Sequence, residues 1–114
     1  MTDCLFCKLC SGQIPATITY RDDEVVAFKD IGPKAPFHEL VIPIRHIGGL
    51  GDAQPADAAL LGKLALVAAQ RARDGGLAAG GFRVVTNVGP DAGQSVPHLH
   101  LHVLAGRALG WPPG

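Results

Sequence analysis

Three histidines near the end of the chain, His98, His100 and His102, alternate with Leu99 and Leu101. Side chains in a β-strand alternate between the two faces of the sheet. This spacing therefore predicts three imidazoles on one face and buried aliphatic side chains on the other. Neighbouring imidazoles on such a face lie about 7 Å apart, close enough to act on one substrate group. Imidazole titrates near neutrality, so unprotonated rings are available as nucleophiles without a special base.

Two other interpretations of the histidine pattern remain open. The three rings could form the solvated polar face of an amphipathic strand, although Thr, Lys or Glu would serve that purpose equally well. They could also bind one metal ion by themselves, although one strand rarely supplies three ligands to a tetrahedral ion. Catalysis by the histidines explains the pattern better than either alternative.

A loop of small residues, 89–95, runs into the histidine segment with the sequence Gly-Pro-Asp-Ala-Gly-Gln-Ser. Its glycines let backbone N–H groups approach an anion closely, and the Ser95 hydroxyl adds a donor. Alone, such a loop is only a turn. Beside three histidines, it is typical of a phosphate-binding loop.

Three cysteines at positions 4, 7 and 10 lie together near the start of the chain. An odd, clustered count argues against a disulfide framework. Cys4 and Cys7 form a Cys-x-x-Cys pair, which indicates metal or redox chemistry but requires further ligands elsewhere in the chain. Cys10 is expected to be a small buried side chain.

The rest of the chain predicts the elements that position these residues. β-Rich runs flank Arg21-Asp22-Asp23 as in a hairpin, and Leu61, Leu64, Ala65, Ala68 and Ala72 form the apolar stripe of one long helix. Hairpins with one long helix predict an α+β domain on an antiparallel sheet. The expected elements are a short helix at 4–11, strands at 17–20, 24–28, 38–43, 82–87 and 99–104, and a long helix at 55–73.

Length and composition limit the class of protein. A chain of 114 residues predicts a single domain, 1–114, and 47% hydrophobic with 18% charged residues excludes intrinsic disorder. Ten basic residues balance ten acidic ones, so we expect no nucleic acid and no membrane as partners. The first residues lack the pattern of a signal peptide and no apolar run is long enough to span a membrane, so we expect a soluble, cytoplasmic protein.

The run from Gln94 to Val103, with its His-φ-His-φ-His-φ-φ pattern, resembles the signature of the histidine-triad (HIT) family of nucleotide hydrolases and transferases. Further resemblances in family order are Phe6-Cys7-Lys8, Ala27-Phe28-Lys29-Asp30-Ile31, Pro36-Phe37-His38, Leu40-Val41-Ile42-Pro43 and the terminal Trp111-Pro112-Pro113-Gly114. That ending resembles the Hint branch, whose members are purine nucleoside phosphoramidases.

This resemblance implies a fold and an assembly. The fold is a five-stranded antiparallel sheet with one long helix and a short N-terminal helix. Two such sheets join in a homodimer, with the C-terminal tail 106–114 near the partner's site. Trp111 fits that expectation, because a single subunit could hardly bury it on a tail rich in Gly and Pro.

The resemblance also implies the roles of the site residues. His100 attacks the α-phosphorus of a nucleoside monophosphate derivative and forms a nucleotidyl-histidine that water hydrolyses. His102 contacts the phosphate or the leaving group as a proton donor, and His38 orients these rings. Ser95 belongs to the catalytic set and also contacts phosphate. The implied nucleotide contacts are Asn87, Gly93, Gln94 and Ser95 at the phosphate, Asp30 at the ribose, and Leu5, Phe6, Leu9, Phe28, Ile31 and Leu40 around the base.

Several of these residues also have an ordinary structural explanation. Phe28 and Ile31 could be core residues, Asp30 could be a turn carboxylate, and Asn87 could cap a turn. Their joint presence in family order favours the functional interpretation. The implied substrates are purine nucleotides or AMP conjugates such as adenosine phosphoramidates. A dinucleoside polyphosphate hydrolase and a non-catalytic nucleotide-binding adaptor are the alternatives.

No metal is required for this chemistry, because the intermediate forms on histidine. Some bacterial relatives nevertheless bind a structural zinc, and the matching positions here are Cys4, Cys7, His46 and His98. Two thiolates and two imidazoles would form the closed tetrahedral site that structural zinc prefers. His98 cannot easily serve both zinc and substrate, so its ligation would leave His38, His100 and His102 for catalysis.

Overall fold

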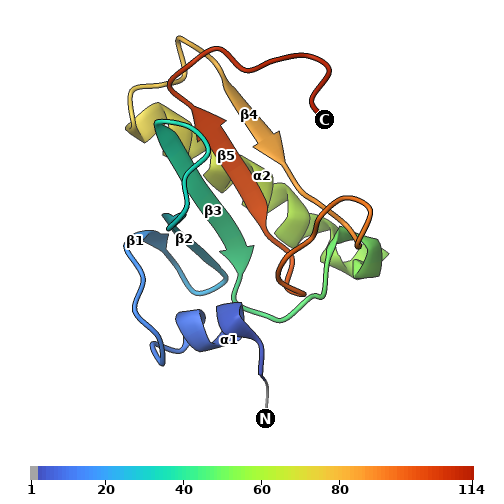
Figure 1. Cartoon of the computed structure of the whole chain (residues 1–114). Coiled ribbons are helices and arrows are strands. Elements are labelled where there is room, and N and C mark those ends of the chain that lie inside the picture. The colour runs from blue at the N-terminus through green and yellow to red at the C-terminus, as the bar shows by residue number, and fades with distance from the viewer. Residues whose placement is uncertain (1–2) are drawn as a thin grey trace.

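The computed structural model describes residues 3–114, and its elements follow the β-rich and helical runs of the sequence (Figure 1). The strands Ile18–Arg21 (β1), Val25–Lys29 (β2), Phe37–Pro43 (β3), Phe82–Val85 (β4) and Leu101–Ala105 (β5) form one antiparallel sheet in the order β1-β2-β3-β5-β4. The helices are Leu5–Cys10 (α1) and Ala58–Asp74 (α2), and two 3-10 turns lie at Leu50–Asp52 and Pro55–Asp57. The predicted α+β fold is therefore confirmed.

The two faces of the sheet are covered by different helices. Alternation along β2 places Val25 and Ala27 in a core beneath α2, and Val26 and Phe28 in a second core beneath α1. Figure 1 shows α2 running behind β3 and β5, whereas the short α1 lies at one end of the opposite face. That second face is only partly covered, so it has room for a site.

Helix α2 ends one residue after its predicted end, but its predicted first turn, Pro55–Asp57, is a separate 3-10 turn. The Asp57 carboxylate accepts a hydrogen bond from the Gln54 N–H at 2.8 Å and pairs with Arg45, which fixes the turn before the helix. The helix ends at Gly75, and Gly76 follows with a φ of +74°, a conformation that favours glycine. Its buried positions are Leu64, Val67, Ala68 and Ala72.

Two further details of the prediction are wrong. The stripe of α2 includes Val67 rather than Ala65, which is exposed. Strand β5 begins at Leu101, so His98 and His100 precede the strand and only His102 lies within it. Pro97 explains part of this difference, because proline has no N–H to donate to a sheet.

A buried ion pair anchors α2 to the sheet next to the site. Arg71 Nε lies 2.9 Å from Glu39 Oε1, and Thr19 Oγ1 donates a second hydrogen bond to the same oxygen at 2.8 Å. The Glu39 side chain is only 4% exposed, so its charge requires both partners. Glu39 follows His38 along β3, so the ion pair also fixes the strand that carries His38.

No described helix is long and apolar enough to cross a membrane.

Candidate active site and metal cluster

Strand register brings two of the histidines together on the face of α1. Leu40 of β3 pairs with His102 of β5, and His38 pairs with Leu104. His38 and His102 are therefore diagonal neighbours on one face, a position from which long side chains meet. The His38 Nε2 and His102 Nδ1 atoms lie 2.8 Å apart.

A chain of hydrogen bonds sets which nitrogen of each ring carries the proton. The Lys34 backbone N–H donates to His38 Nδ1 at 3.0 Å, so the neutral His38 ring carries its proton on Nε2. That Nε2–H donates to His102 Nδ1, which leaves the proton of His102 on its own Nε2. His102 therefore offers an N–H donor from its outer nitrogen.

Both rings of this pair are neutral at physiological pH. Burial, reinforced by the neighbouring His100 and His38, lowers the pKa of His102 to about 4. Burial also lowers the pKa of His38, against the opposing effect of Asp30, whose Oδ2 lies 3.5 Å from His38 Nε2. The hydrogen-bond chain consequently operates with uncharged imidazoles.

His100 has the opposite arrangement of donor and lone pair. Its Nδ1 lies 2.7 Å from the backbone oxygen of His98, so Nδ1 carries the proton and Nε2 carries the lone pair. The ring is 3% exposed, its centroid lies 5.1 Å from that of His102, and Phe6 packs edge-on against it at 5.2 Å. A nucleophilic nitrogen and a proton donor thus stand side by side.

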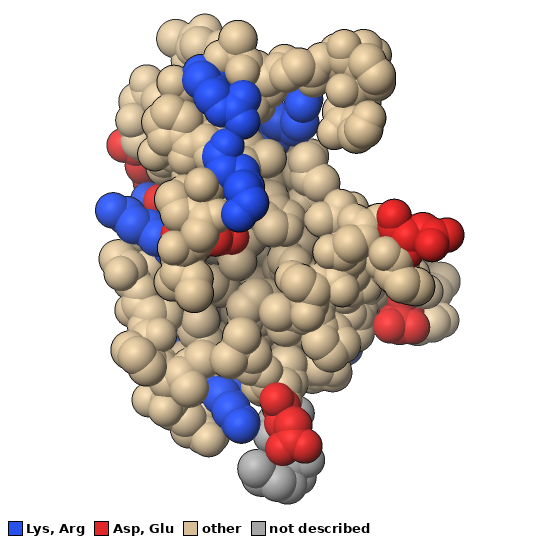
Figure 2. Space-filling view, viewed as in Figure 1, with Lys and Arg blue, Asp and Glu red and all other residues tan. Residues whose placement is uncertain are grey.

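These two rings line a pocket of about 350 Å³ on the face of α1. Its other walls are mostly apolar, which suits a planar base. Figure 2 shows this face of the molecule, with Lys and Arg gathered at the upper left, Asp and Glu mainly at the right and lower edges, and an uncharged area between them. The lining residues are Leu5, Phe6, Leu9, Ile14, Pro15, Ala16, Phe28, Lys29, Asp30, Ile31, Leu40, Ser95, Val96, His100 and His102.

All six residues expected around the base lie in this lining, as do Asp30 and Ser95. Asn87, Gly93 and Gln94 lie outside the lining. His38 also lies outside it and contacts the lining residue His102. The Gln94 side chain instead connects three loop segments. Its Nε2 donates to Gly48 O at 2.7 Å and to Val96 O at 3.0 Å, and its Oε1 accepts from Gly89 N at 3.0 Å. Gln94 therefore fixes the shape of the loop that carries Ser95.

The four expected metal ligands meet at the other end of the same face. Ligand atoms of Cys4, Cys7, His46 and His98 all lie within 4.8 Å of one another. Cys4 Sγ and Cys7 Sγ lie 3.3 and 3.6 Å from His98 Nδ1, and Cys7 Sγ lies 3.4 Å from His46 Nδ1. The two Nδ1 atoms are 3.2 Å apart.

These distances fit the edges of a tetrahedron around a metal ion. Bonds of about 2.3 Å to sulfur and about 2.0–2.1 Å to nitrogen place S and N ligands about 3.5 Å apart and two N ligands about 3.3 Å apart. His98 Nε2 lies 2.8 Å from Pro43 O and donates to it, which leaves Nδ1 with the lone pair that a metal needs. The four residues therefore form a cluster able to hold a metal.

The neutral ring of His98 suits metal ligation, whereas the Cys7 thiol must first lose its proton. Burial lowers the pKa of His98, so the ring is neutral and its Nδ1 can ligate. Burial and the neighbouring Cys4 sulfur raise the pKa of the Cys7 thiol to about 11. A thiolate at this position therefore needs a cation beside it, as a bound metal would provide.

A second group of potential ligands, Asp30, His38 and His102, is unsuited to a metal. Their ligand atoms also lie within 4.8 Å of one another. A metal on His38 Nε2 would move the ring proton to Nδ1, where the Lys34 N–H already donates at 3.0 Å. The Nδ1–H of His38 and the backbone N–H of Lys34 would then face each other with no acceptor between them. Asp30, His38 and His102 are therefore better suited to the hydrogen-bond chain than to a metal. The histidine triad likewise forms no shared metal site, because His98 belongs to the cysteine cluster and His100 faces the pocket.

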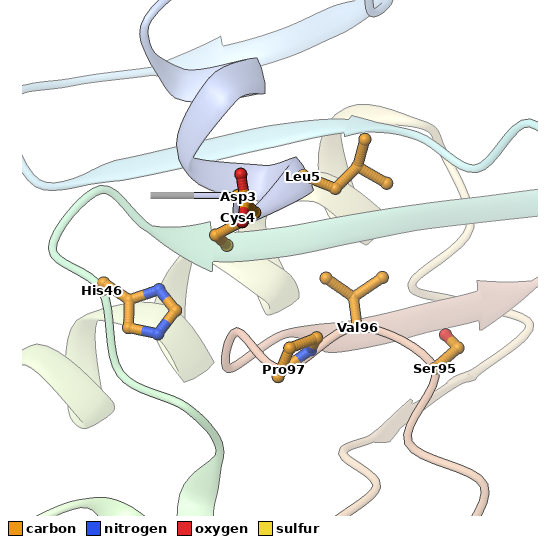
Figure 3. Close-up of a pocket in the computed structure, with 7 residues that line it drawn as sticks. All are labelled: Asp3, Cys4, Leu5, His46, Ser95, Val96 and Pro97. Atoms are coloured by element: carbon orange, nitrogen blue, oxygen red, sulfur yellow. The ribbon is translucent and has the colours of Figure 1, made fainter. Parts of the chain in front are cut away.

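A second hollow of about 460 Å³ lies between the metal cluster and the loop before β5. Figure 3 shows Val96 of the loop pointing toward α1 beneath Leu5, with His46 and Cys4 on one side and Ser95 on the other. Leu5, Ser95 and Val96 line both hollows. The N-terminal turn of α1 thus forms part of the partition between them.

The class of protein is thus an α+β domain with a five-stranded antiparallel sheet and two adjacent histidines at the wall of an apolar pocket. Residues 11–109 match the HIT domain family. A HIT-like protein of Synechocystis is 49% identical over 112 residues, which cover 98% of this chain and 97% of the relative. The chain belongs to the HIT domain family.

Solved structures of similar proteins share the whole fold. A HIT family hydrolase from Legionella pneumophila is 46% identical with a TM-score of 0.97, covering 98% of this chain and 100% of the other. A histidine triad protein from Clostridium difficile is 43% identical with a TM-score of 0.93, covering 96% of each chain. The hydrolase neighbours indicate a hydrolase.

Sequence reasoning missed the groups that act through the backbone. The Lys34 N–H, the Pro43 carbonyl and the His98 carbonyl each set the proton position of a histidine ring. Every residue except proline carries an N–H, and every residue carries a carbonyl, so no residue type could have marked them. The pocket residues Ile14, Pro15, Ala16 and Val96 were also missed, because small and aliphatic residues carry no functional signal.

Proposed function

We propose that this protein is a hydrolase of the Hint-like branch, acting on nucleoside 5′-monophosphate conjugates such as adenosine phosphoramidates. The observation that carries the proposal is the pair of complementary tautomers. His100 presents a lone pair on Nε2, and His102 presents a proton on Nε2, at the same wall of one pocket. Displacement at phosphorus needs these two groups together.

In the first step, His100 Nε2 attacks the α-phosphorus and forms a P–N bond as the bond to the leaving group breaks. The leaving nitrogen takes the electron pair of that bond and a proton from His102 Nε2, whose lone pair is then available for the second step. The His98 carbonyl holds the Nδ1 proton of His100 and stabilises the positive charge that the ring acquires.

In the second step, water attacks the nucleotidyl-histidine. The new P–O bond forms as the P–N bond to His100 breaks, and His102 Nε2 takes up the proton that water releases. Nucleoside monophosphate is the product, and both rings return to their starting tautomers. His38 acts as a positioning residue, because its Nε2–H keeps Nδ1 of His102 unprotonated.

The substrate contacts follow from the pocket walls. Phe6, Phe28 and Leu40 favour a purine through stacking and apolar contact. Asp30 Oδ1 accepts from Gly32 N at 2.7 Å, which orients the carboxylate toward the ribose hydroxyls. We assign phosphate contacts to Ser95 and to the backbone of the loop that Gln94 holds, with Asn87 and Gly93 beside them.

Zinc is the metal that we assign to the cysteine and histidine cluster. Two sulfur and two nitrogen ligands suit zinc in a closed tetrahedral site. When bound, zinc would supply structural stabilisation. Reduced thiols are required for this ligation, which favours a cytoplasmic location.

A homodimer completes the proposal. Trp111 is 82% exposed, with the Arg83 guanidinium 5.9 Å from its ring, and Val84 of the edge strand β4 is 41% exposed. Figure 1 shows the C-terminal tail passing beside β4. An unpaired edge with exposed apolar side chains favours association with a second copy.

The test uses His100→Ala and an adenosine phosphoramidate. We expect turnover to fall by at least about 10³-fold while AMP binding persists, because the variant removes only the nucleophile. Quenched reactions of the wild type should contain phosphorus bound to histidine. Near-normal turnover in the variant would refute the mechanism. Faster turnover of diadenosine polyphosphates would favour the polyphosphate hydrolase, and binding without turnover would favour the adaptor.

A further inference from the structure

Helix α1 contributes to two sites at once. Cys7 on the helix and Cys4 at its N-cap supply both sulfur ligands of the metal cluster. The same helix supplies Leu5, Phe6 and Leu9 to the wall of the nucleotide pocket. A displacement of this helix would therefore change both sites together.

Phe6 connects the two sites directly. It lies between Cys4 and Cys7 in the sequence, and its ring packs edge-on against His98 at 5.9 Å and against His100 at 5.2 Å. The opposite contact is with Phe28 of β2, at 5.4 Å. One ring thus touches a metal ligand, the nucleophile and the far wall of the pocket.

Cys4 and Phe6 pack in the core at the N-terminal turn of α1, but the helix itself adds little stability. The helix has six residues, far fewer than an isolated helix needs for stability in water. Its N-cap is the Cys4 sulfur, which accepts the Cys7 N–H at 3.4 Å, and a sulfur acceptor is weak. Leu5, at the same turn, is 49% exposed. A metal bound by both sulfurs, His46 and His98 would hold this turn against the loops after β3 and before β5.

The residues shared by the two hollows are part of the same arrangement. Leu5, Ser95 and Val96 line both the hollow beside the metal ligands and the nucleotide pocket, so they lie between the two. If the turn at Cys4 moves, Leu5 moves away from Val96 and the pocket opens toward the cluster.

We propose that Cys4 and Cys7 are positioning residues for the nucleotide, because their ligation of the metal holds α1 as a wall of the base pocket. Metal and nucleotide then raise each other's affinity, although neither touches the other. This inference rests on the proposed function only in requiring that the pocket binds a nucleotide, and it does not depend on turnover.

The test measures this coupling in both directions. The dissociation constant of AMP is measured by titration calorimetry on zinc-loaded and on chelated protein, with circular dichroism showing that both are folded. The dissociation constant of zinc is measured with and without saturating AMP, by competition with a chromophoric chelator. Linkage requires the two ratios to be equal, and we expect about fivefold or more.

Two cysteine variants provide the matched comparison. Cys10 is buried on the same helix but lies outside the metal cluster. Cys7→Ser should weaken AMP binding to the level of chelated wild type and make it insensitive to zinc. Cys10→Ala should retain the zinc-dependent difference. In kinetic assays, chelation should raise KM more than it lowers kcat, a split that loss of folded protein would not produce.

Several results would overturn the inference. AMP affinity within twofold for zinc-loaded and chelated protein would show that α1 needs no metal to form the wall. If the chelated chain unfolds, the test rests on the dissociation constant of zinc measured with and without saturating AMP. A zinc affinity that AMP does not change would contradict the coupling. Zinc-loaded protein that binds no AMP would overturn both the nucleotide pocket and this inference. Intact coupling without hydrolysis would overturn only the proposed chemistry.

Discussion

Removal of one sulfur ligand should destabilise the fold by an amount that the loop lengths allow us to calculate. The cluster joins α1 to the turn after β3 and to the segment before β5. The ligand pairs Cys7–His46 and His46–His98 are separated by 39 and 52 residues. A cross-link that closes a loop of either length lowers the entropy of the unfolded chain by an amount worth about 4 kcal/mol.

The measured loss should be smaller than the sum of the two closures. Unfolded chains also bind zinc through cysteine and histidine, which offsets part of the stabilisation. Cys4 holds the same segment as Cys7, so Cys7→Ser acts by releasing the metal, and we take the offset to equal about one of the two closures. We therefore expect a loss of about 4 kcal/mol. For a chain of this size, that loss corresponds to a decrease in Tm of about 15 °C.

The assay is calorimetric unfolding of the wild type, Cys7→Ser and Cys10→Ala, each with zinc and with a chelator. The wild type and Cys10→Ala should lose stability on chelation, whereas Cys7→Ser should already be near the chelated wild type. Turnover at saturating substrate should fall much less than stability, because His100 is not a ligand. A wild-type Tm that is unchanged by chelation would refute the reasoning and identify the cysteines as packing residues. Loss of turnover in proportion to zinc at constant Tm would make the metal catalytic instead.

Two further outcomes follow from the histidines and the tail. Burial lowers the pKa of His102 from 6.5 in the unfolded chain to about 4 in the folded chain. The contribution of His102 to the free energy of unfolding is therefore complete above about pH 6.5 and is lost toward pH 4. The free energy of unfolding should fall by about 3 kcal/mol over that range, and His102→Asn should flatten the dependence. For the dimer, light scattering at micromolar concentration should give about twice the 11.8 kDa of one chain, and a monomer mass would refute the assembly.

Patterns with a short period could be predicted from the sequence. The hairpin around Arg21-Asp22-Asp23, the long helix and the five strands follow from alternation and from helical spacing. The Cys-x-x-Cys pair required further ligands at a distance. Only the resemblance pointed to His46 and His98, and the structure places both beside the sulfurs. Long-range placement of this kind depends on how β3 and β5 leave the sheet, which local spacing does not encode.

The histidine alternation predicted the wrong local structure for a physical reason. A continuous strand would have aligned the three rings at equal spacing on one face. Instead, the chain leaves the sheet before Leu101, and His98 turns toward the cysteines while His100 and His102 line the pocket. Alternation describes the sequence of the segment, but the backbone N–H missing at Pro97 and the contacts of His98 determine where pairing begins.

The same change of backbone direction resolves the apparent conflict at His98. The sequence suggested that this residue must serve either a metal or the substrate. In the structure, its ring lies among the cluster ligands through Nδ1, whereas its backbone oxygen accepts the Nδ1 proton of His100 at 2.7 Å. Ring and carbonyl belong to one residue but point to different sites, so neither role excludes the other. Any residue at this position could supply that backbone carbonyl, but only histidine supplies the ring. Replacing His98 should therefore remove one ligand from the cluster. It should affect His100 only by shifting the backbone carbonyl that holds the Nδ1 proton of that ring.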